Sequence, residues 1–305
     1  MKVRETMNLD QLVNDLCQME EKKTVAVAEA TNVETLKAIK EGVERDLAAF
    51  KLFGNMELIR EAADEIELDL EQERITLHHA TSVENAVEKA VMSVSEERSD
   101  VLMKGNVATK IVLKAVLKKN SGLRNGRILS HVALFEIPNR DGLLFLTDAG
   151  MNIAPDLEEK VQIIQNSVDV AHRLGYDNPK VAPLAAVEIV NPAMQASVDA
   201  AVLSQMQKRG QISGCTVDGP LAFDNAISLE SKQEKNINSD VAGSADILVC
   251  PYIEVGNTLY KSFTYFANAR VAGIISGAKA PIVLTSRADT AESKIYSLAF
   301  ALTSS

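Results

Sequence analysis

Apolar and polar residues along this chain follow two different periods in turn. Short continuous apolar runs predict buried strands, and the segments after them carry apolar residues three and four positions apart, which predicts helices. Leu36, Ile39 and Val43, for example, share one helical face. The strands predicted in this first part are 24–28, 47–53, 74–78 and 100–103. Strands that alternate with helices indicate parallel βαβ units, and therefore an α/β fold.

Two of the predicted helices begin at a capping-box sequence. Thr31-Asn-Val-Glu34 and Thr81-Ser-Val-Glu84 each place a glutamate three residues after a threonine. In this motif the threonine hydroxyl accepts a backbone N–H and the glutamate side chain reaches back to the threonine. We therefore expect Thr31 and Thr81 to be the N-caps.

The pattern changes after residue 127, where two strand-like runs follow each other without a helix. Residues 128–137 and 143–147 are joined by Pro138-Asn-Arg-Asp-Gly142, a turn sequence that predicts an antiparallel hairpin. Alternation then resumes, with helices predicted at 156–174 and 192–208, strands at 180–187, 212–217, 246–249 and 282–284, and a last helix ending near Leu302. We assign the last strand and helix to the first domain, so that the expected domains are 1–128 plus 280–305 and 129–279.

Composition indicates a soluble globular protein with a sizeable core. The 305 residues are 46% hydrophobic and 24% charged, and the length suits two domains. No apolar run is long enough to cross a membrane, and Met1–Asp10 lacks the apolar core of a signal peptide, so we expect a cytoplasmic protein. The cysteines Cys17, Cys215 and Cys250 are scattered, which fits reduced buried thiols.

Charge and aromatic content argue against a nucleic-acid partner. The formal net charge is −10, aromatic residues make up 4% of the chain, and tryptophan is absent. An acidic protein that binds an anionic substrate needs local cations and backbone N–H groups to overcome its overall charge.

The strongest candidate for such a site is 281–290, P-I-V-L-T-S-R-A-D-T. Ser286, Arg287 and Asp289 follow a predicted strand and precede a predicted helix, where α/β proteins bind anions. A guanidinium at this place would hold an anion through two hydrogen bonds, although a surface arginine is the alternative. Asp289 also begins the capping-box spacing Asp289-Thr-Ala-Glu292, so a helix cap is the alternative for this carboxylate.

Two more strand-to-helix junctions carry a cation. Lys104-Gly105-Asn106 follows one strand, and Gly256-Asn257, with Lys261 one turn later, follows another. The second junction is similar to half of a phosphate loop but lacks GxxxxGK[ST], and a glycine turn beside a solvated lysine fits equally well. Because parallel strands present their carboxyl ends on one edge of a sheet, several such junctions together favour an anion site.

Other kinds of site find little support. His78 and His79 have no cysteine or acidic partner at metal-ligand spacing, so we expect no metal site. No GxGxxG or GxSxG follows a strand, which argues against a dinucleotide fingerprint and an α/β-hydrolase triad. Asp148-Ala-Gly150 after the hairpin is best explained as a turn.

In their order, several short runs make the chain resemble the phosphate acetyl/butyryltransferases, and the butyryltransferase branch most. The similarity extends from about Val101 to the C-terminus, and the first hundred residues match mainly in their alternation of predicted strands and helices. The runs are Leu102-Met-Lys-Gly105, Leu129-Ser-His131, Leu146-Thr-Asp-Ala-Gly150, 243–251, Val255-Gly-Asn257 and Thr285-Ser-Arg-Ala-Asp289.

The resemblance implies a two-domain α/β fold similar to isocitrate and isopropylmalate dehydrogenases, with an interdomain cleft, in a homodimer or higher homo-oligomer. It implies the reaction of an acyl-coenzyme A, butyryl or a similar short or branched acyl group, with inorganic phosphate. The products are an acyl phosphate and free coenzyme A. No resident cofactor or metal is expected, and neither nucleic acid nor a membrane is an expected partner.

The resemblance also implies roles for single residues. Ser286 and Arg287 match a functional Ser-Arg pair of the related acetyltransferases. The general-base aspartate of those enzymes falls on Ser293 here, and Asp289 is the carboxylate nearest in sequence to the Ser-Arg pair. On this basis Arg287 binds phosphate and the developing oxyanion, and Ser286 donates a hydrogen bond. The residues expected to bind substrate are Lys104, Gly105, Asn106, Ser130, Asn257 and Lys261.

Two alternatives stay open at this stage. A nicotinamide-dependent hydroxy-acid dehydrogenase of the same fold would need clustered acidic residues for a divalent metal and several substrate arginines, and the sequence shows neither grouping. A non-catalytic acyl-coenzyme A-binding protein would keep the cleft without the chemistry.

Overall fold

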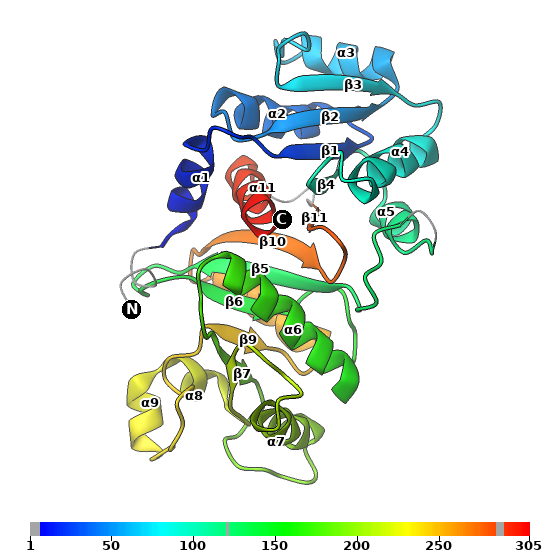
Figure 1. The fold of residues 1–305 in the computed structure, drawn as a ribbon. Coiled ribbons are helices and arrows are strands. Elements are labelled where there is room, and N and C mark those ends of the chain that lie inside the picture. The colour runs from blue at the N-terminus through cyan, green and yellow to red at the C-terminus, as the bar shows by residue number, and fades with distance from the viewer. Residues whose placement is uncertain (1–6, 120–121, 285–289) are drawn as a thin grey trace. The chain divides into compact units, whose positions relative to one another are not determined.

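The computed structural model describes residues 7–119, 122–284 and 290–305, which form two compact units (Figure 1). Named for their place in the sequence, the terminal unit comprises 9–127 with 272–305, and the central unit comprises 128–271 with the described residues before Leu9. The expected domains, 1–128 plus 280–305 and 129–279, stay a prediction, because compactness alone does not show that each unit folds independently.

The terminal unit is built on a sheet of mainly parallel strands. Its strand order is β3-β2-β1-β4-β11-β10, where β10 is antiparallel to β11 and the other neighbours are parallel. The strands are β1 (Thr24–Ala28), β2 (Ala49–Gly54), β3 (Ile75–His79), β4 (Val101–Lys104), β10 (Arg270–Ser276, in this unit from Ala272) and β11 (Ile282–Val283). The predicted parallel βαβ units are therefore confirmed.

Most helices of the terminal unit bury an apolar face, whereas α11 is buried on nearly all sides. In α2, Leu36 and Ile39 are fully buried, as their spacing predicts. The helices are α1 (Leu9–Cys17), α2 (Val33–Glu44), α3 (Met56–Asp64), α4 (Val83–Ser95), α5 (Thr109–Val116) and α11 (Ala291–Ser304).

The expected N-caps were wrong by one residue. Asn32 caps α2 by accepting from the Thr35 N–H at 3.0 Å, and Ser82 caps α4 by accepting from the Asn85 N–H. The Thr31 hydroxyl instead donates to the Glu29 carboxylate. A cap need only have a polar acceptor and extended backbone, and Asn and Ser satisfy both conditions.

The last helix begins in the same way. Thr290 caps α11 by accepting from the Ser293 N–H at 3.1 Å. The alternative role of Asp289 as the cap is therefore filled by its neighbour.

The central unit has a mixed sheet with the strand order β5-β6-β9-β7-β8. Its strands are β5 (Ser130–Glu136), β6 (Leu144–Thr147), β7 (Lys180–Pro183), β8 (Thr216–Val217) and β9 (Ile247–Val249). β5 and β6 are antiparallel, which confirms the hairpin, and the other pairs are parallel. Asn139 and Gly142 make the turn with φ of 63° and 71°, values that Asn and Gly tolerate best.

Helices α6 (Leu157–Arg173), α7 (Gln195–Lys208), α8 (Phe223–Ile227), α9 (Leu229–Glu234) and α10 (Ile253–Tyr265) complete this unit. Asp156 and Glu159 form a capping box at the start of α6. Phe135 of β5 and Phe263 of α10 meet edge to face in the core, with ring centroids 5.1 Å apart. This contact holds α10 against the sheet.

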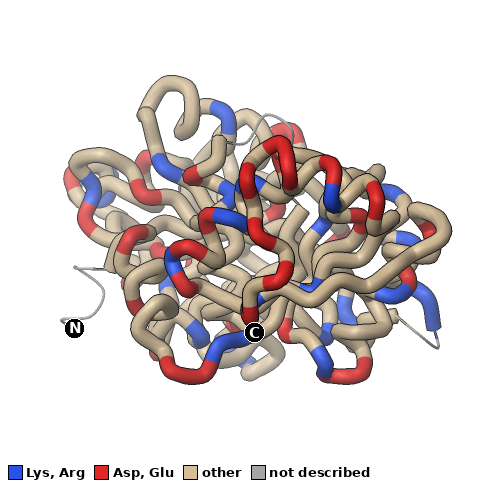
Figure 2. Tube along the Cα trace, turned by 90° about the horizontal axis from the view of Figure 1, so that it is seen from above, with Lys and Arg blue, Asp and Glu red and all other residues tan. Residues whose placement is uncertain are grey.

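Charged residues of both signs are interspersed along the trace (Figure 2). Among the residues described here, no helix combines the length and apolar character needed to cross a membrane.

Candidate functional site

The terminal sheet has a topological switch point between β1 and β4. The chain runs from β1 to β2 and β3 on one side, and then returns to place β4 on the other side of β1. The loops after β1 and β4 therefore diverge, and α/β proteins bind ligands in the crevice that this leaves. A pocket of about 190 Å³ lies there. Its lining residues are Asn32, Glu34, Thr35, Met103, Lys104, Gly105, Asn106, Val107, Ala108 and Lys294.

Gly105 brings the two loops into contact. Its N–H donates to the Ala28 carbonyl at 2.8 Å, and the Asn106 N–H donates to the Glu29 carbonyl at 2.7 Å. A Cβ atom at position 105 would lie 2.2 Å from the Glu29 carbonyl oxygen, so a side chain does not fit. Gly105 thus fixes the place of its neighbours, and its expected substrate contact stays a prediction.

Positive groups converge on the pocket. Lys104 is half-buried, with its ammonium group 3.3 Å from the Gly105 carbonyl, and Asn106 is exposed. The N-termini of α2 and α5 border the same space, and the N-cap of α5, Ala108, offers no side-chain acceptor to the first turn. Helix N-termini favour anions because their first amides lack intrahelical partners.

Lys294 is a pocket residue that sequence reasoning missed. It comes from the first turn of α11 and is 7% exposed, and its Nζ lies 3.6 Å from Glu34 Oε2. A hydrogen bond from Lys37, the charge of Lys37 and then the charge of Lys294 lower the pKa of Glu34. The available signal was a lysine one position after Ser293, the single basic residue of a helix rich in apolar residues.

Ser286, Arg287 and Asp289 lie outside the described residues, so their roles stay predictions. The strand before them is described: Val283 of β11 pairs with Met103 of β4 in parallel register. Leu284 therefore leaves the sheet at the level of Lys104. Ser293, at the position counted for the family's aspartate, hydrogen-bonds with Thr290 in the cap of α11.

Asn257 and Lys261 are exposed on α10 of the central unit. Four residues apart, they share one face of the helix. The expectation that Gly256 and Asn257 precede this helix was wrong, because α10 begins at Ile253. A Cβ at position 256 would lie 2.3 Å from the Asp148 carbonyl oxygen, so Gly256 permits close packing rather than forming half of a phosphate loop. Substrate binding by Asn257 and Lys261 stays a prediction.

Two other positions of the central unit have internal partners. Asp148 accepts from the N–H groups of Gly150 and Met151 at 2.8 and 2.9 Å, which confirms the turn. Ser130 is fully buried, and its hydroxyl accepts from the Asn166 amide at 2.9 Å. This contact favours a structural role for Ser130, and its expected substrate contact is untested.

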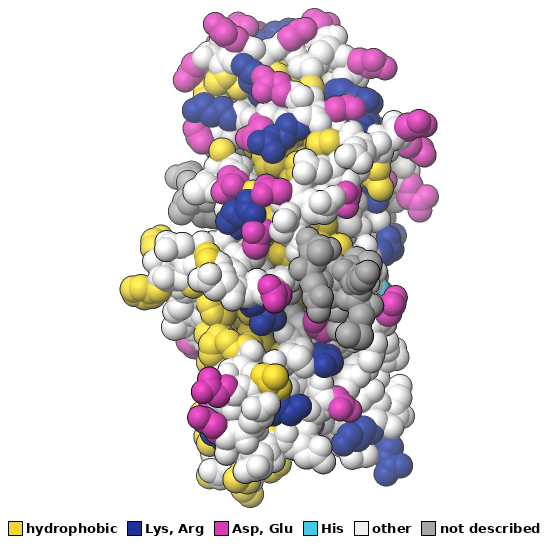
Figure 3. Space-filling view, turned by 90° about the vertical axis from the view of Figure 1, so that its left-hand side faces the viewer, with side chains coloured by type: hydrophobic (Ala, Val, Ile, Leu, Met, Phe, Trp, Pro, Cys, Tyr) yellow, Lys and Arg dark blue, Asp and Glu magenta, His cyan; other side chains and the backbone are white. Residues whose placement is uncertain are grey.

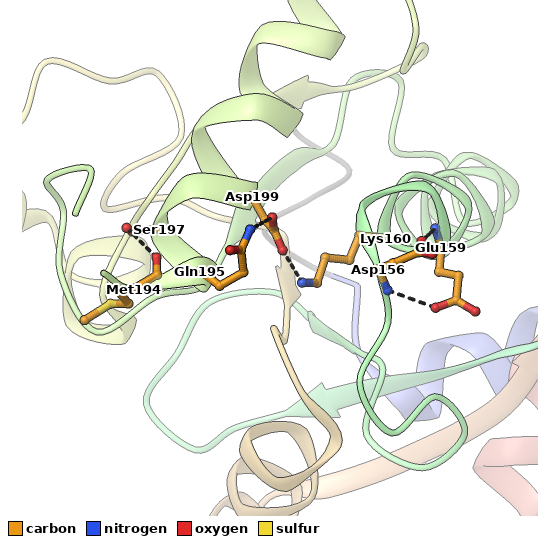
Figure 4. Close-up of polar contacts among 7 residues, drawn as sticks. All are labelled: Asp156, Glu159, Lys160, Met194, Gln195, Ser197 and Asp199. Carbon is orange, nitrogen blue, oxygen red and sulfur yellow. Dashed lines mark hydrogen bonds and ion pairs between the residues drawn. The ribbon is translucent and has the colours of Figure 1, made fainter. Parts of the chain in front are cut away.

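Lys160 is the centre of a buried polar cluster in the central unit (Figure 4). Its Nζ is 2.6 Å from Asp199 Oδ2, and the Gln195 amide donates to Asp199 Oδ1 at 2.7 Å. The ammonium group also lies 5.5 Å from the centre of the Tyr252 ring. The cluster joins α6, α7 and the residue before α10, and each charge has a close partner.

Metal and thiol chemistry find no support at these positions. Across the described ranges, no group of three or more His, Cys, Asp or Glu side chains is arranged to hold a metal ion. His78 stacks on Phe53, and burial together with the charges of Lys51, Arg98 and Lys89 lowers its pKa. Burial raises the pKa of Cys215 to about 12, so this thiol is a poor nucleophile at neutral pH.

Comparison with known proteins decides the class of the site. Residues 75–302 match the family model described as "Phosphate acetyl/butaryl transferase". The chain belongs to this family. It is 53% identical over 283 residues to the probable phosphate butyryltransferase of Bacillus subtilis (strain 168), covering 93% of each chain. It is 47% identical over 294 residues to the phosphate butyryltransferase of Clostridium beijerinckii (strain ATCC 51743 / NCIMB 8052), covering 96% of each.

A solved structure agrees with this membership. The branched-chain phosphotransacylase of Enterococcus faecalis V583 superposes with a TM-score of 0.81 at 37% identity, covering 92% of this chain and 98% of that one. The predicted dehydrogenase-like α/β fold class is thereby confirmed. The chain is a phosphate acyltransferase, and the dehydrogenase and non-catalytic alternatives are not favoured.

Proposed function

We propose that this acyltransferase converts butyryl-coenzyme A, or a similar short or branched acyl-coenzyme A, and inorganic phosphate into acyl phosphate and free coenzyme A. The names of the relatives, phosphate butyryltransferase and branched-chain phosphotransacylase, support a short or branched acyl group as the one transferred. The pocket at the β1/β4 switch point carries the proposal for an anionic substrate, because it joins Lys104 and Lys294 to two helix N-termini.

The proposed reaction is direct attack within a ternary complex. A phosphate oxygen forms a bond to the thioester carbonyl carbon, the C–S bond breaks, and the leaving thiolate gains the proton that hydrogen phosphate loses. Arg287 holds phosphate and the developing oxyanion, while Ser286 donates a hydrogen bond to the oxyanion or the sulfur. Proximity and charge stabilisation supply most of the acceleration. The proposal needs no resident cofactor, metal ion or covalent acyl-serine.

Asp289 is proposed to carry this proton: it passes the proton from phosphate to the thiolate, and accepts it from the thiol in the reverse direction. Because Thr290 caps α11, the carboxylate of Asp289 is not required for that purpose. Asp289→Asn and Asp289→Ala should then lose activity alike, with little change in stability. Full activity in Asp289→Asn would contradict a proton-transfer role.

The proposal includes a cytoplasmic homodimer or higher homo-oligomer. Large apolar side chains of the central unit support association, since Phe266 is 88% and Tyr265 74% exposed. Figure 3 shows hydrophobic side chains gathered among charged ones on one face.

Thiol release tests the reaction. The protein is incubated with butyryl-coenzyme A and phosphate, and free thiol is followed with time. Phosphate-dependent release supports the transferase, whereas binding without release contradicts it. Faster reaction with acetyl-coenzyme A would refute the butyryl preference and leave the reaction class intact.

Arg287→Ala tests the proposed anion clamp. We expect kcat/KM to fall by roughly 10²–10⁴, because one charged group that stabilises the transition state is lost. Arg60→Ala, an exposed arginine on α3, is the control and should retain activity. Near-normal activity in folded Arg287→Ala would overturn the assignment.

A further inference from the structure

Lys294 is buried at the pocket, and its ion-pair partner among the described residues is a weak one. Removing an ammonium group from water is costly unless a close counter-ion and further hydrogen bonds compensate. The Glu34 side chain is 66% exposed and lies 3.6 Å away, beyond the usual length of a charged hydrogen bond. Lys37 Nζ also donates a hydrogen bond to the same carboxylate, 3.1 Å from Glu34 Oε1. The pair in this structure therefore compensates Lys294 poorly.

The other groups of the pocket favour an anion in this space. Lys104 supplies a second positive charge, and the N-terminal turns of α2 and α5 supply partial positive charge. Among the described lining residues, Glu34 is the one carboxylate, and its exposure leaves it able to turn into solvent. A ligand carrying phosphoryl oxygens would give Lys294 a closer counter-ion than Glu34 does.

We propose that Lys294 is a substrate-binding residue that holds a phosphoryl oxygen in the β1/β4 pocket, and that Glu34 is the counter-ion that the substrate displaces. This inference rests on the proposed function, because the substrates of that reaction, inorganic phosphate and acyl-coenzyme A, both carry phosphoryl oxygens. Glu34 then acts as a competitor of the substrate: it pairs with the lysine before substrate binds and releases it when the anion enters.

Binding and kinetics of three variants test the proposal. Lys294→Gln removes the proposed ligand, Glu34→Gln removes the competitor, and Lys37→Gln is the matched control on the same carboxylate. Calorimetry gives the Kd of inorganic phosphate and of coenzyme A separately, and steady-state assays give the KM of each substrate. The two ligands distinguish which phosphoryl group occupies the pocket.

We expect Lys294→Gln to raise Kd and KM for one of the two ligands by about 10- to 100-fold, because the variant loses one charged hydrogen bond to that ligand. Glu34→Gln should lower the same constants by about two- to five-fold, since it removes a weak competing ion pair. Lys37→Gln should leave them within two-fold of the parent protein.

Unchanged constants for both ligands in folded Lys294→Gln would overturn the proposal, as would equal weakening in Lys37→Gln. Should Lys294→Gln not fold, Lys294→Arg, which keeps the charge, must retain binding, and the exposed Glu34→Gln must still tighten it. Binding is measured without turnover, so the two proposals can fail separately. Lys294-dependent phosphate binding without thiol release would contradict the proposed reaction alone.

Discussion

Lys160 in the central unit and Lys294 in the terminal unit are both almost fully buried, but their counter-ions differ. Asp199 lies 2.6 Å from Lys160, its side chain is 12% exposed, and Gln195 holds its other oxygen. Glu34 lies 3.6 Å from Lys294, its side chain is 66% exposed, and Lys37 shares it.

The difference separates two uses of a buried cation. Removing one partner of a closed buried pair leaves a charge without compensation, so such a pair holds elements together. Removing a cation from an exposed carboxylate leaves that carboxylate in water, at little cost. Lys160 therefore stabilises its unit by holding helices together, and Lys294 is available to bind a ligand.

Breaking the Lys160 pair should have the largest effect on stability. We expect Lys160→Ala to lower the free energy of unfolding by about 3–5 kcal/mol, because the Asp199 carboxylate stays buried without its partner. Denaturant unfolding measures the change, and Lys118→Ala, from the exposed pair with Glu88, is the control.

A double variant checks the reason for that loss. Lys160→Met combined with Asp199→Leu removes both charges and should recover most of the stability, because apolar side chains of similar volume often replace a buried pair at no cost. A double variant as unstable as the single one would point to lost packing instead of an uncompensated charge.

Lys294→Met should have a much smaller effect on stability. Methionine keeps most of the packing in α11, and the lost ion pair with exposed Glu34 is worth about 0–1 kcal/mol. The same unfolding experiment measures it. A loss of 3 kcal/mol or more would place Lys294 in the same class as Lys160 and remove the contrast between them.

Local pattern was enough to predict most of the strands. The apolar runs at 24–28 and 246–249 predict β1 and β9 to within a residue, and the Asn139 and Gly142 turn predicts the hairpin. These signals are local, because burial and turn conformation act on the residues that carry them.

Features that depend on distant partners were missed or shifted. β10 pairs with β11 and was not predicted, and the predicted strand 180–187 ends as β7 at Pro183, where an isolated bridge between Leu184 and Leu221 continues the pairing. Helices α1 and α3 were also missed, although both have apolar faces.

At the candidate site, too, local motifs were predicted and contacts between distant segments were missed. The motif after β4 identified Lys104 and Asn106 as site residues, and both line the pocket. Lys294 reaches that pocket from α11, and its partner Glu34 comes from α2 near the other end of the chain. A single sequence does not show that these two helices meet.

The smallest expected effect concerns the titration of Glu34, whose pKa lies below its ordinary value of 4.5. The folded state therefore favours the ionised carboxylate. Its contribution to stability is present above the unfolded pKa and is lost as the pH falls through the lower folded pKa. Lys37 contributes most to the shift and Lys294 less, so Lys37→Gln should raise the pKa of Glu34 more than Lys294→Gln does.

The pKa of Glu34, measured with and without phosphate, tests whether Lys294 has a displaceable counter-ion and so differs from Lys160. If a bound anion replaces Glu34 as the counter-ion of Lys294, adding phosphate or coenzyme A must raise the pKa of Glu34. This rise must disappear in Lys294→Gln. Carbon-13 NMR of the side-chain carboxyl group measures both. A pKa of Glu34 that neither ligand moves would leave Lys294 without the displaceable counter-ion that distinguishes it from Lys160.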